Sequence, residues 1–89
     1  MPELNIIYVG KKPTMNYVLA IVTQFNNNVD HILIKARGKA ISKAVDIAEI
    51  TRHKFIQELK YDKINLETEV VHSDRGDSNV SSIEITLKR

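Results

Sequence analysis

The chain has 89 residues, of which 43% are hydrophobic and 27% are charged, a composition typical of one globular domain and not of a disordered or fibrous chain. It has no cysteine, which excludes disulfides, thiolate metal sites and a thiol nucleophile, and its net charge is only +2. Met1–Asn5 is not a basic region leading into a long apolar run, and no stretch could span a bilayer. We therefore expect a soluble, cytoplasmic protein without a signal peptide.

The first two predicted elements are a strand and a helix. The apolar, β-branched segment Leu4–Val9 ends at Gly10 and predicts a short, mostly buried strand. Pro13 stands near the first turn of the next element, where its missing N–H costs a helix little. Apolar side chains then recur at helical spacing, at Met15, Val18, Leu19, Val22 and Phe25. Asn26–Asn28 should end this helix, because Asn tolerates the left-handed conformation common at helix C-termini.

A second strand and a second helix follow. Val29–Ala36 has a continuous apolar centre, which is typical of a strand inside a sheet and covered by helices. Arg37–Lys39 turns the chain into a helix from about Ala40 to Leu59. This helix has apolar side chains on more than one side, from which we expect a second contact with another subunit. They are Ile41, Ala44, Val45, Ile47, Ala48, Ile50 and Phe55.

Two strands complete the chain. Apolar and polar residues alternate from Ile64 to Val70 and again from Ile83 to Leu87, with a polar turn at Ser73–Asn79 between them. A strand over Lys63–Val71 would reach roughly 30 Å, so the hairpin tip should project into solvent. The predicted fold class is α/β: a two-layer β-α-β-α-β-β sandwich with a protruding β-hairpin, in one domain over residues 1–89.

The charges are unevenly distributed along the chain. Residues 1–45 contain six bases and two acids, whereas residues 46–72 contain four bases and six acids. A basic front is typical of a surface that binds a polyanion, although most charge clusters are solvated surface.

The strongest candidate site is formed by two strand-to-helix loops. Gly10–Thr14 and Lys35–Lys39 each place bases beside a glycine just before a helix, where free N–H groups favour phosphate. Successive strands of this fold tend to be parallel, so both loops should open at one end of the sheet. One patch would then contain Lys11, Lys12, Arg37 and Lys39, with Tyr17 one turn into the first helix. The alternative is that the glycines serve the turns and the lysines keep them soluble.

No catalytic constellation is visible. Neither loop has the glycine spacing of a nucleotide-binding fingerprint. His31, His53 and His72 are scattered, and no cysteine could complete a zinc site, so we expect neither a metal nor a cofactor. Asp46 and Glu49 share a helix face near Arg52, where solvated charge is a better interpretation than acid–base chemistry. We expect the protein not to be an enzyme.

The predicted hairpin has two interpretations. A thin two-stranded arm can enter a minor groove about 6 Å wide, and Arg75 stands at its tip. Asp74 and Asp77 flank this arginine, however, and phosphate repels carboxylates. An ordinary surface turn remains the alternative.

Three segments resemble the Alba family of archaeal chromatin proteins. They are Val9–Ala20 (VGKKPTMNYVLA), Ile34–Asp46 (IKARGKAISKAVD) and Val80–Ile85 (VSSIEI), which appear in order over nearly the whole chain. Two positions depart from the family pattern. Lys39 stands where we expect Arg. A lysine keeps the charge but lacks the planar guanidinium that binds phosphate through two hydrogen bonds. The hairpin tip is shorter and more acidic, with Asn79 where a base is common.

The resemblance implies a fold like the C-terminal domain of translation initiation factor three, a homodimer, and binding of double-stranded DNA and RNA with little sequence preference. It implies contacts through Lys11 and Lys12, with acetylation of one of them weakening binding, and hence an acetyltransferase and a deacetylase as possible partners. The implied nucleic-acid-binding residues are Lys11, Lys12, Asn16, Tyr17, Arg37, Lys39 and Arg75. Phe55 falls where family members pack dimer against dimer.

From these features we expect a chromosome-associated dimer that binds and compacts duplex DNA, with no membrane partner. Three alternatives remain open. The main target could be RNA, which has the same phosphate chemistry. A small acid–base enzyme could use His31 or Glu49, but it needs a concave site. A pure assembly module would act through Phe55 and the second helix.

Overall fold

The computed structural model describes residues 5–89 and consists of a four-stranded sheet with two helices. The elements are β1 (Asn5–Tyr8), α1 (Thr14–Asn26), β2 (His31–Arg37), α2 (Ile41–Ile50), β3 (Lys60–Ser73) and β4 (Gly76–Lys88). Their order confirms the predicted β-α-β-α-β-β chain and the α/β class. The predicted beginning of the first strand at Leu4 lies outside the described residues. Within 5–89, no helix is both long and apolar enough to cross a membrane.

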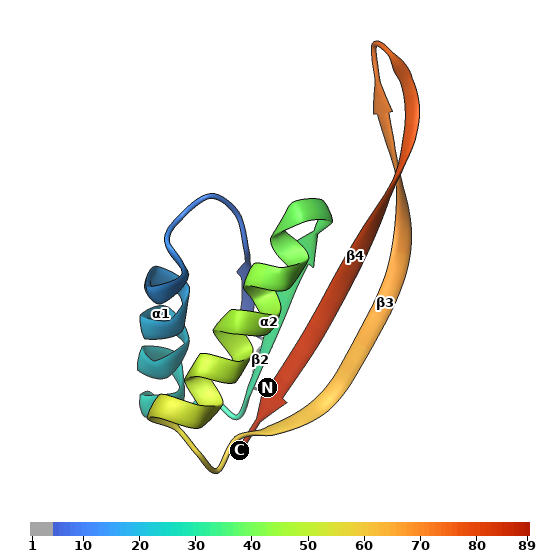
Figure 1. Ribbon diagram of the computed structural model, residues 1–89. Helices are drawn as coiled ribbons and strands as arrows, with labels where there is room; N and C mark the ends of the chain where they lie inside the picture. Colours follow the sequence, from blue (N-terminus) through green and yellow to red (C-terminus); the bar gives the residue numbers. More distant parts are fainter. Residues whose placement is uncertain (1–4) are drawn as a thin grey trace.

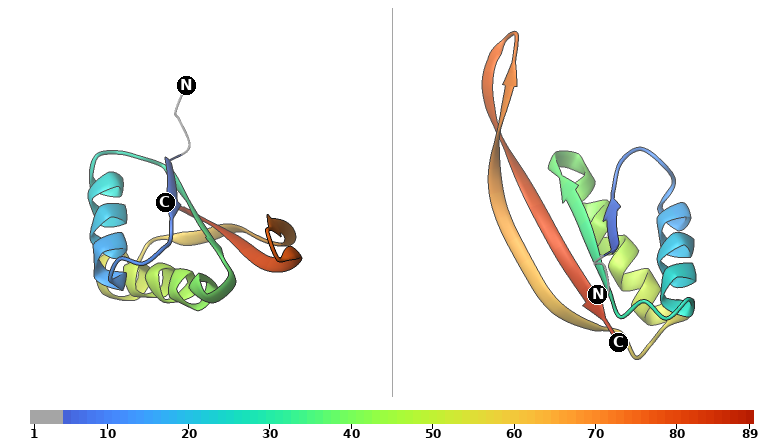
Figure 2. Two further views of the ribbon diagram at one scale, coloured as in Figure 1. Left: turned by 90° about the horizontal axis from the view of Figure 1, so that it is seen from above. Right: turned by 180° about the vertical axis from the view of Figure 1, so that it is seen from behind.

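The sheet has the strand order β1-β2-β4-β3. β1 and β2 are parallel, and β4 runs antiparallel to both β2 and β3. β2 therefore lies inside the sheet, as its continuous apolar centre predicted. Both helices pack on one face of the sheet and leave the other face open (Figures 1 and 2).

The core lies between this face and the helices. β2 contributes Ile32 and Ile34, and its partner β4 contributes Ile85 and Leu87. Phe25 is the largest fully buried side chain. From the helices, the side chains of Val18, Ile21, Ala44, Ile47 and Ala48 complete the layer. The first helix ends as expected, since Asn28 has the left-handed backbone conformation with φ 69°.

The second helix is shorter than predicted. A 3-10 turn, Gly38–Ala40, precedes α2, and a π-helical turn, Thr51–Phe55, ends it, so the predicted helical stretch from Ile56 to Leu59 is wrong. Ile56 has the non-helical backbone angles φ −126° and ψ 89°, and both Ile56 and Leu59 are buried beyond this turn. Arg52 holds this bend by donating from Nε to the Leu59 carbonyl oxygen at 3.1 Å.

The hairpin is longer than predicted. Only Asp74 and Arg75 separate β3 from β4, so the expected polar turn over Ser73–Asn79 is wrong. Its later residues are in β4, where Asp77 pairs with His72 across the strands. Gly76 permits the tight turn with φ 107°. The tip projects well beyond the helices, as expected (Figure 1), and the molecule measures 44 × 29 × 17 Å.

The helices leave one apolar stripe of the sheet uncovered. On β3, Ile64 is 53% exposed, Leu66 74% and Val70 55%. Ile64 pairs with buried Ile85, so this stripe is on the helix side of the sheet.

Candidate nucleic-acid interface

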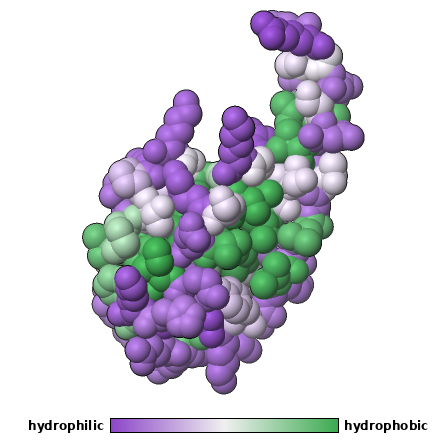
Figure 3. Space-filling model, viewed as in Figure 1, coloured by the Kyte–Doolittle hydropathy of each residue, from purple (hydrophilic) through white to green (hydrophobic). Residues whose placement is uncertain are grey.

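Both basic loops lie at the same end of the sheet. Because β1 and β2 are parallel, the segments that follow them, residues 9–13 and 38–40, emerge side by side. Val9 extends the pairing, donating its N–H to the Lys35 carbonyl oxygen at 2.9 Å. Lys11, Lys12, Arg37 and Lys39 all have exposed side chains. Figure 3 shows long hydrophilic side chains standing out from this end of the molecule.

The β1–α1 loop is held by two side chains. The hydroxyl oxygen of Tyr17 accepts the N–H of Gly10 at 2.8 Å and that of Lys12 at 3.3 Å. The ammonium of Lys43 donates to the carbonyl oxygens of Gly10 at 2.9 Å and Lys12 at 3.0 Å. Sequence reasoning counted Lys43 only as a charge. One signal for a role of Lys43 was available in the sequence. A lysine in the first turn of a helix is unfavourable, because it lies near the positive end of the helix dipole.

Helix α1 begins directly after this loop, at Thr14, with no side-chain cap and no acidic residue in its first turn. Apart from the N–H of Asn16, its first N–H groups are therefore left for solvent or an anion. Asn16 is exposed in this turn, where its own N–H donates to the Pro13 carbonyl oxygen at 3.0 Å.

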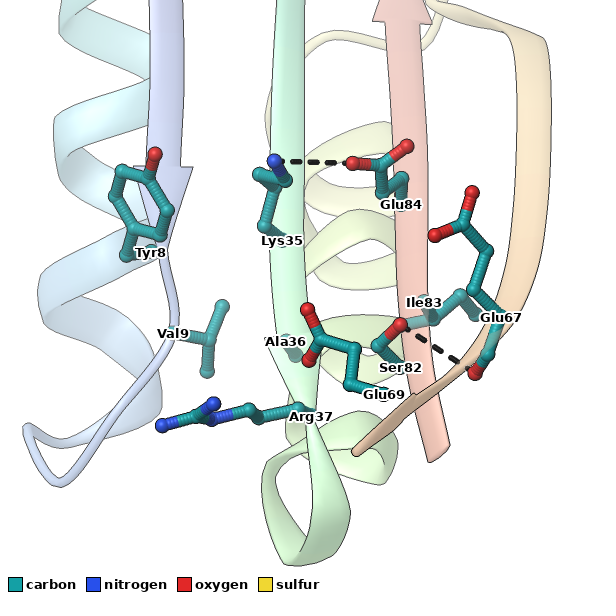
Figure 4. A pocket seen from close by; sticks show the side chains of 10 residues that line it. All are labelled: Tyr8, Val9, Lys35, Ala36, Arg37, Glu67, Glu69, Ser82, Ile83 and Glu84. Atoms are coloured by element: carbon teal, nitrogen blue, oxygen red, sulfur yellow. Dashed lines mark hydrogen bonds and ion pairs between the residues drawn. The ribbon is translucent and has the colours of Figure 1, made fainter. Parts of the chain in front are cut away.

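Arg37 lies at the end of β2, on the open face of the sheet. It lines a hollow of about 480 Å³ together with Tyr8, Lys35, Glu67 and Glu69, and its side chain extends toward the end of β1 (Figure 4). Gly38 follows with φ 59°, a left-handed conformation that favours glycine and turns the chain into the helix.

An ion pair crosses the same open face. Lys35 Nζ lies 3.0 Å from Glu84 Oε2 (Figure 4). The hydrogen bond and charge of Glu84 raise the pKa of Lys35 above its usual value. Hydrogen bonds from Lys35 and Asn65 hold the pKa of Glu84 below its usual value.

The carboxylates of the second helix have structural partners. Glu49 accepts from Arg52 at 2.9 Å and from the Tyr61 hydroxyl at 3.0 Å. The Tyr61 hydrogen bond and then that of Arg52 lower the pKa of Glu49, while burial and then Glu49 raise that of Tyr61. Glu49 thus joins α2 to the start of β3, which favours a structural role.

The three histidines lie in different parts of the fold, on β2, in the π-helical turn and on β3. His53 lies 3.4 Å from Glu49 Oε2, and His72 Nδ1 lies 2.6 Å from Asp77 Oδ1 near the hairpin tip. In the described part of the chain, no three His, Asp or Glu residues gather as metal ligands would.

Two other predicted site residues lie away from the loops. Arg75 is in the two-residue turn at the hairpin tip, between Asp74 and Gly76. Phe55 ends the π-helical turn, with its side chain 43% exposed. The structure thus brings together the predicted loop residues but neither of these two.

Comparison with known proteins gives consistent matches. The Alba family model matches residues 5–68. The DNA/RNA-binding protein Alba of Thermoplasma acidophilum is 73% identical over 89 residues, all of both chains, and that of Picrophilus torridus is 74% identical over 90, again all of both. The solved structure of Alba from Thermoplasma volcanium superposes with a TM-score of 0.92 at 74% identity, covering 96% of this chain and 100% of that one. ALBA1 from Trypanosoma brucei, only 22% identical, shares the fold with a TM-score of 0.80 over 98% of this chain and 70% of its own.

The fold and the site define a small two-layer α/β protein that presents two cationic loops at one end of its sheet. The chain belongs to the Alba family. The further likeness to the C-terminal domain of translation initiation factor three stays a prediction.

Proposed function

We propose that residues 1–89 act as one domain that binds double-stranded DNA, and also RNA, without reading sequence. The observation that carries this proposal is the pair of basic loops at one end of the sheet, the first of them opening an uncapped helix. The names of the relatives describe DNA- and RNA-binding proteins, and none of those reported above describes an enzyme. We propose no catalytic role, metal or cofactor.

The central patch comprises Lys11, Lys12, Asn16, Tyr17, Arg37 and Lys39. Its cations would neutralise phosphates and release condensed counterions, so affinity should fall steeply as salt rises. Phosphate contacts position a protein on nucleic acid but convey no sequence, which accounts for weak specificity.

The functional unit in this proposal is a homodimer. The apolar stripe Ile64, Leu66 and Val70 lies on the helix side of the sheet, and Val45 of α2 is 42% exposed on the helix layer. Apolar surface lies over α2 and the neighbouring β3–β4 hairpin in Figure 3. A second copy would bury these side chains. Two patches related by a twofold axis would match the approximate symmetry of a duplex.

Other parts of the molecule would extend this contact. Phe55 would pack dimer against dimer, so that dimers coat and compact the DNA of the chromosome in the cytoplasm. Arg75 would approach the minor groove, against the repulsion of Asp74 and Asp77. Acetylation of Lys11 or Lys12 by an acetyltransferase would remove one charge per subunit and weaken binding, and a deacetylase would restore it.

A second candidate function keeps the same patch and makes RNA the main target. The same patch supports it, since exposed lysines and an uncapped helix N-terminus fit the phosphates of either nucleic acid.

The test is to titrate two unrelated duplexes and one structured RNA at several salt concentrations. Similar affinities for both duplexes, with a steep dependence on salt, would support DNA coating. Stronger binding of the RNA in direct competition would favour the second candidate. No binding to any of them at low salt would refute both.

A further inference from the structure

We propose that Lys43 is a positioning residue that, with Tyr17, clamps the Gly10–Lys12 loop and holds the two basic loops as one preformed surface. This inference rests on the proposed function, because the surface concerned is the proposed phosphate site. Lys43 itself is not proposed to touch the nucleic acid.

The clamp uses every peptide hydrogen-bonding group of Gly10 and Lys12. Their N–H groups donate to the hydroxyl oxygen of Tyr17, at 2.8 and 3.3 Å. Their carbonyl oxygens accept from the ammonium of Lys43, at 2.9 and 3.0 Å. Lys11, between them, is the residue whose backbone the clamp leaves free. An exposed loop would otherwise exchange such bonds with water.

Lys43 stands where a lysine is not expected for helix stability. It is the third residue of α2, whose first turn contains no acidic residue. A cation at this end of a helix is unfavourable, because the free N–H groups there carry a partial positive charge. The two hydrogen bonds to the loop offset this cost, and a charged donor makes them stronger than neutral ones.

The clamp joins the two halves of the patch. Lys43 belongs to the helix that follows Arg37 and Lys39, and its ammonium reaches 31 and 33 residues back along the chain to the first loop. Tyr17 belongs to the other helix. Lys11 and Lys12 are thus held at a fixed place relative to the second basic loop. A preformed surface loses less conformational entropy on binding than a mobile one.

A positioning role of Lys43 can be distinguished experimentally from direct contact with phosphate. Two of the three N–H donors of the Lys43 ammonium are used by the loop. Removing a lysine that neutralises a phosphate reduces the salt dependence of binding. Removing a lysine that only holds the loop lowers affinity about equally at every salt concentration.

The variants are Lys43→Met, which keeps the length of the stem, and Lys43→Arg, which keeps charge and donors. Lys60→Met is the matched control, because Lys60 pairs with Lys88 at the opposite end of the sheet. Lys12→Gln serves as the reference for a phosphate contact. The affinity for duplex DNA is measured at several salt concentrations. NMR measures the hydrogen exchange of the Gly10 and Lys12 amides, and thermal unfolding measures stability.

For Lys43→Met we expect duplex binding about tenfold weaker, an unchanged salt slope, and faster exchange of both amides. Lys43→Arg should restore most of the affinity, and Lys60→Met should change it less than about twofold. The loss of affinity caused by Lys43→Met should be smaller in a protein in which Lys11 and Lys12 are both replaced by Gln, because the clamp acts through these two lysines. A purely structural role would lower the unfolding temperature without this coupling.

A salt slope reduced as much as in Lys12→Gln would overturn the proposal and make Lys43 a phosphate contact. Unchanged affinity, or unchanged exchange at Gly10 and Lys12, would overturn it too. If the unaltered protein binds no nucleic acid while Lys43→Met still speeds exchange, the proposed function fails and only the clamp stands.

Discussion

Lys35 and Glu84 form an ion pair of 3.0 Å between the two central strands of the sheet, on the face that the helices leave open. The two residues are also direct partners in the β2–β4 register. Opposite charges facing each other across a strand pair favour that register over a slipped one.

The pair should make stability depend on pH. The folded-state pKa of Glu84 is lowered, so its stabilisation is present above the unfolded-state pKa and is lost as pH falls through the folded-state value. We expect the difference in unfolding free energy between the unaltered protein and Glu84→Gln to shrink from about pH 6 to about pH 3. Urea unfolding measures it. Lys35→Met should give the same trend, and a pH-independent difference would contradict the prediction.

The paired lysines of the first loop should set the salt dependence. Lys11→Gln or Lys12→Gln removes one charge per subunit, as acetylation would. Each should reduce the logarithmic slope of affinity against salt by up to about 1.8 per dimer, at about 0.9 per phosphate. Filter binding or fluorescence anisotropy over several salt concentrations measures the slope. If neither substitution changes the salt slope, neither lysine contacts phosphate.

The exposed stripe of β3 should determine the oligomeric state. Leu66→Gln removes one large apolar side chain per subunit from the proposed interface. Burial of a leucine contributes about 1.5–3 kcal/mol, so two copies should weaken the dimer on the order of 100-fold or more. Sedimentation measures this. Glu67→Gln is the control, because it introduces the same residue on the opposite face, paired with Ser82. Equal effects of both would argue against this interface.

Gly38 should be the costlier glycine to replace at the two loops. Its φ of 59° is strained for any residue with a Cβ, so Gly38→Ala should lower the unfolding free energy by about 1 kcal/mol. The added Cβ would lie 3.5 Å from Val80, an ordinary contact, so the cost comes from the backbone. Gly10→Ala, with its Cβ 3.6 Å from the Tyr17 hydroxyl, should cost less. Chemical denaturation of both variants compares them, and equal losses would count against the conformational cause.

Phe55 should act between dimers and not within them. Phe55→Ala should reduce cooperativity on a long duplex while leaving the affinity for a single-dimer site unchanged, since the central patch is remote from it. Electrophoretic mobility shifts on duplexes of two lengths distinguish the effects. A loss on the short duplex as well would place Phe55 in the dimer or in its folding.

The sequence alone predicted most of the fold and the patch. Its apolar runs and apolar periodicity indicated α1, α2 and the four strands, and the continuous centre of Val29–Ala36 indicated an interior strand. Gly10 and Gly38 marked the two loops, because a glycine before a helix signals a turn even in isolation. These are local patterns, which depend on neighbours a few residues away.

Tertiary structure decided what depends on distant residues. The helix ends before Ile56, and the bend is held by the hydrogen bond from Arg52 to the Leu59 carbonyl oxygen, a contact that helix propensity does not show. Asp77–Asn79 lie in a strand because β3 supplies their partners. The Lys43 clamp joins residues more than 30 positions apart, and only the packing of α2 beside the first loop brings the ammonium to those carbonyls. The sequence determined which residues carry charge and which are apolar, and the packed chain decided which of those charges hold the loop and which remain exposed.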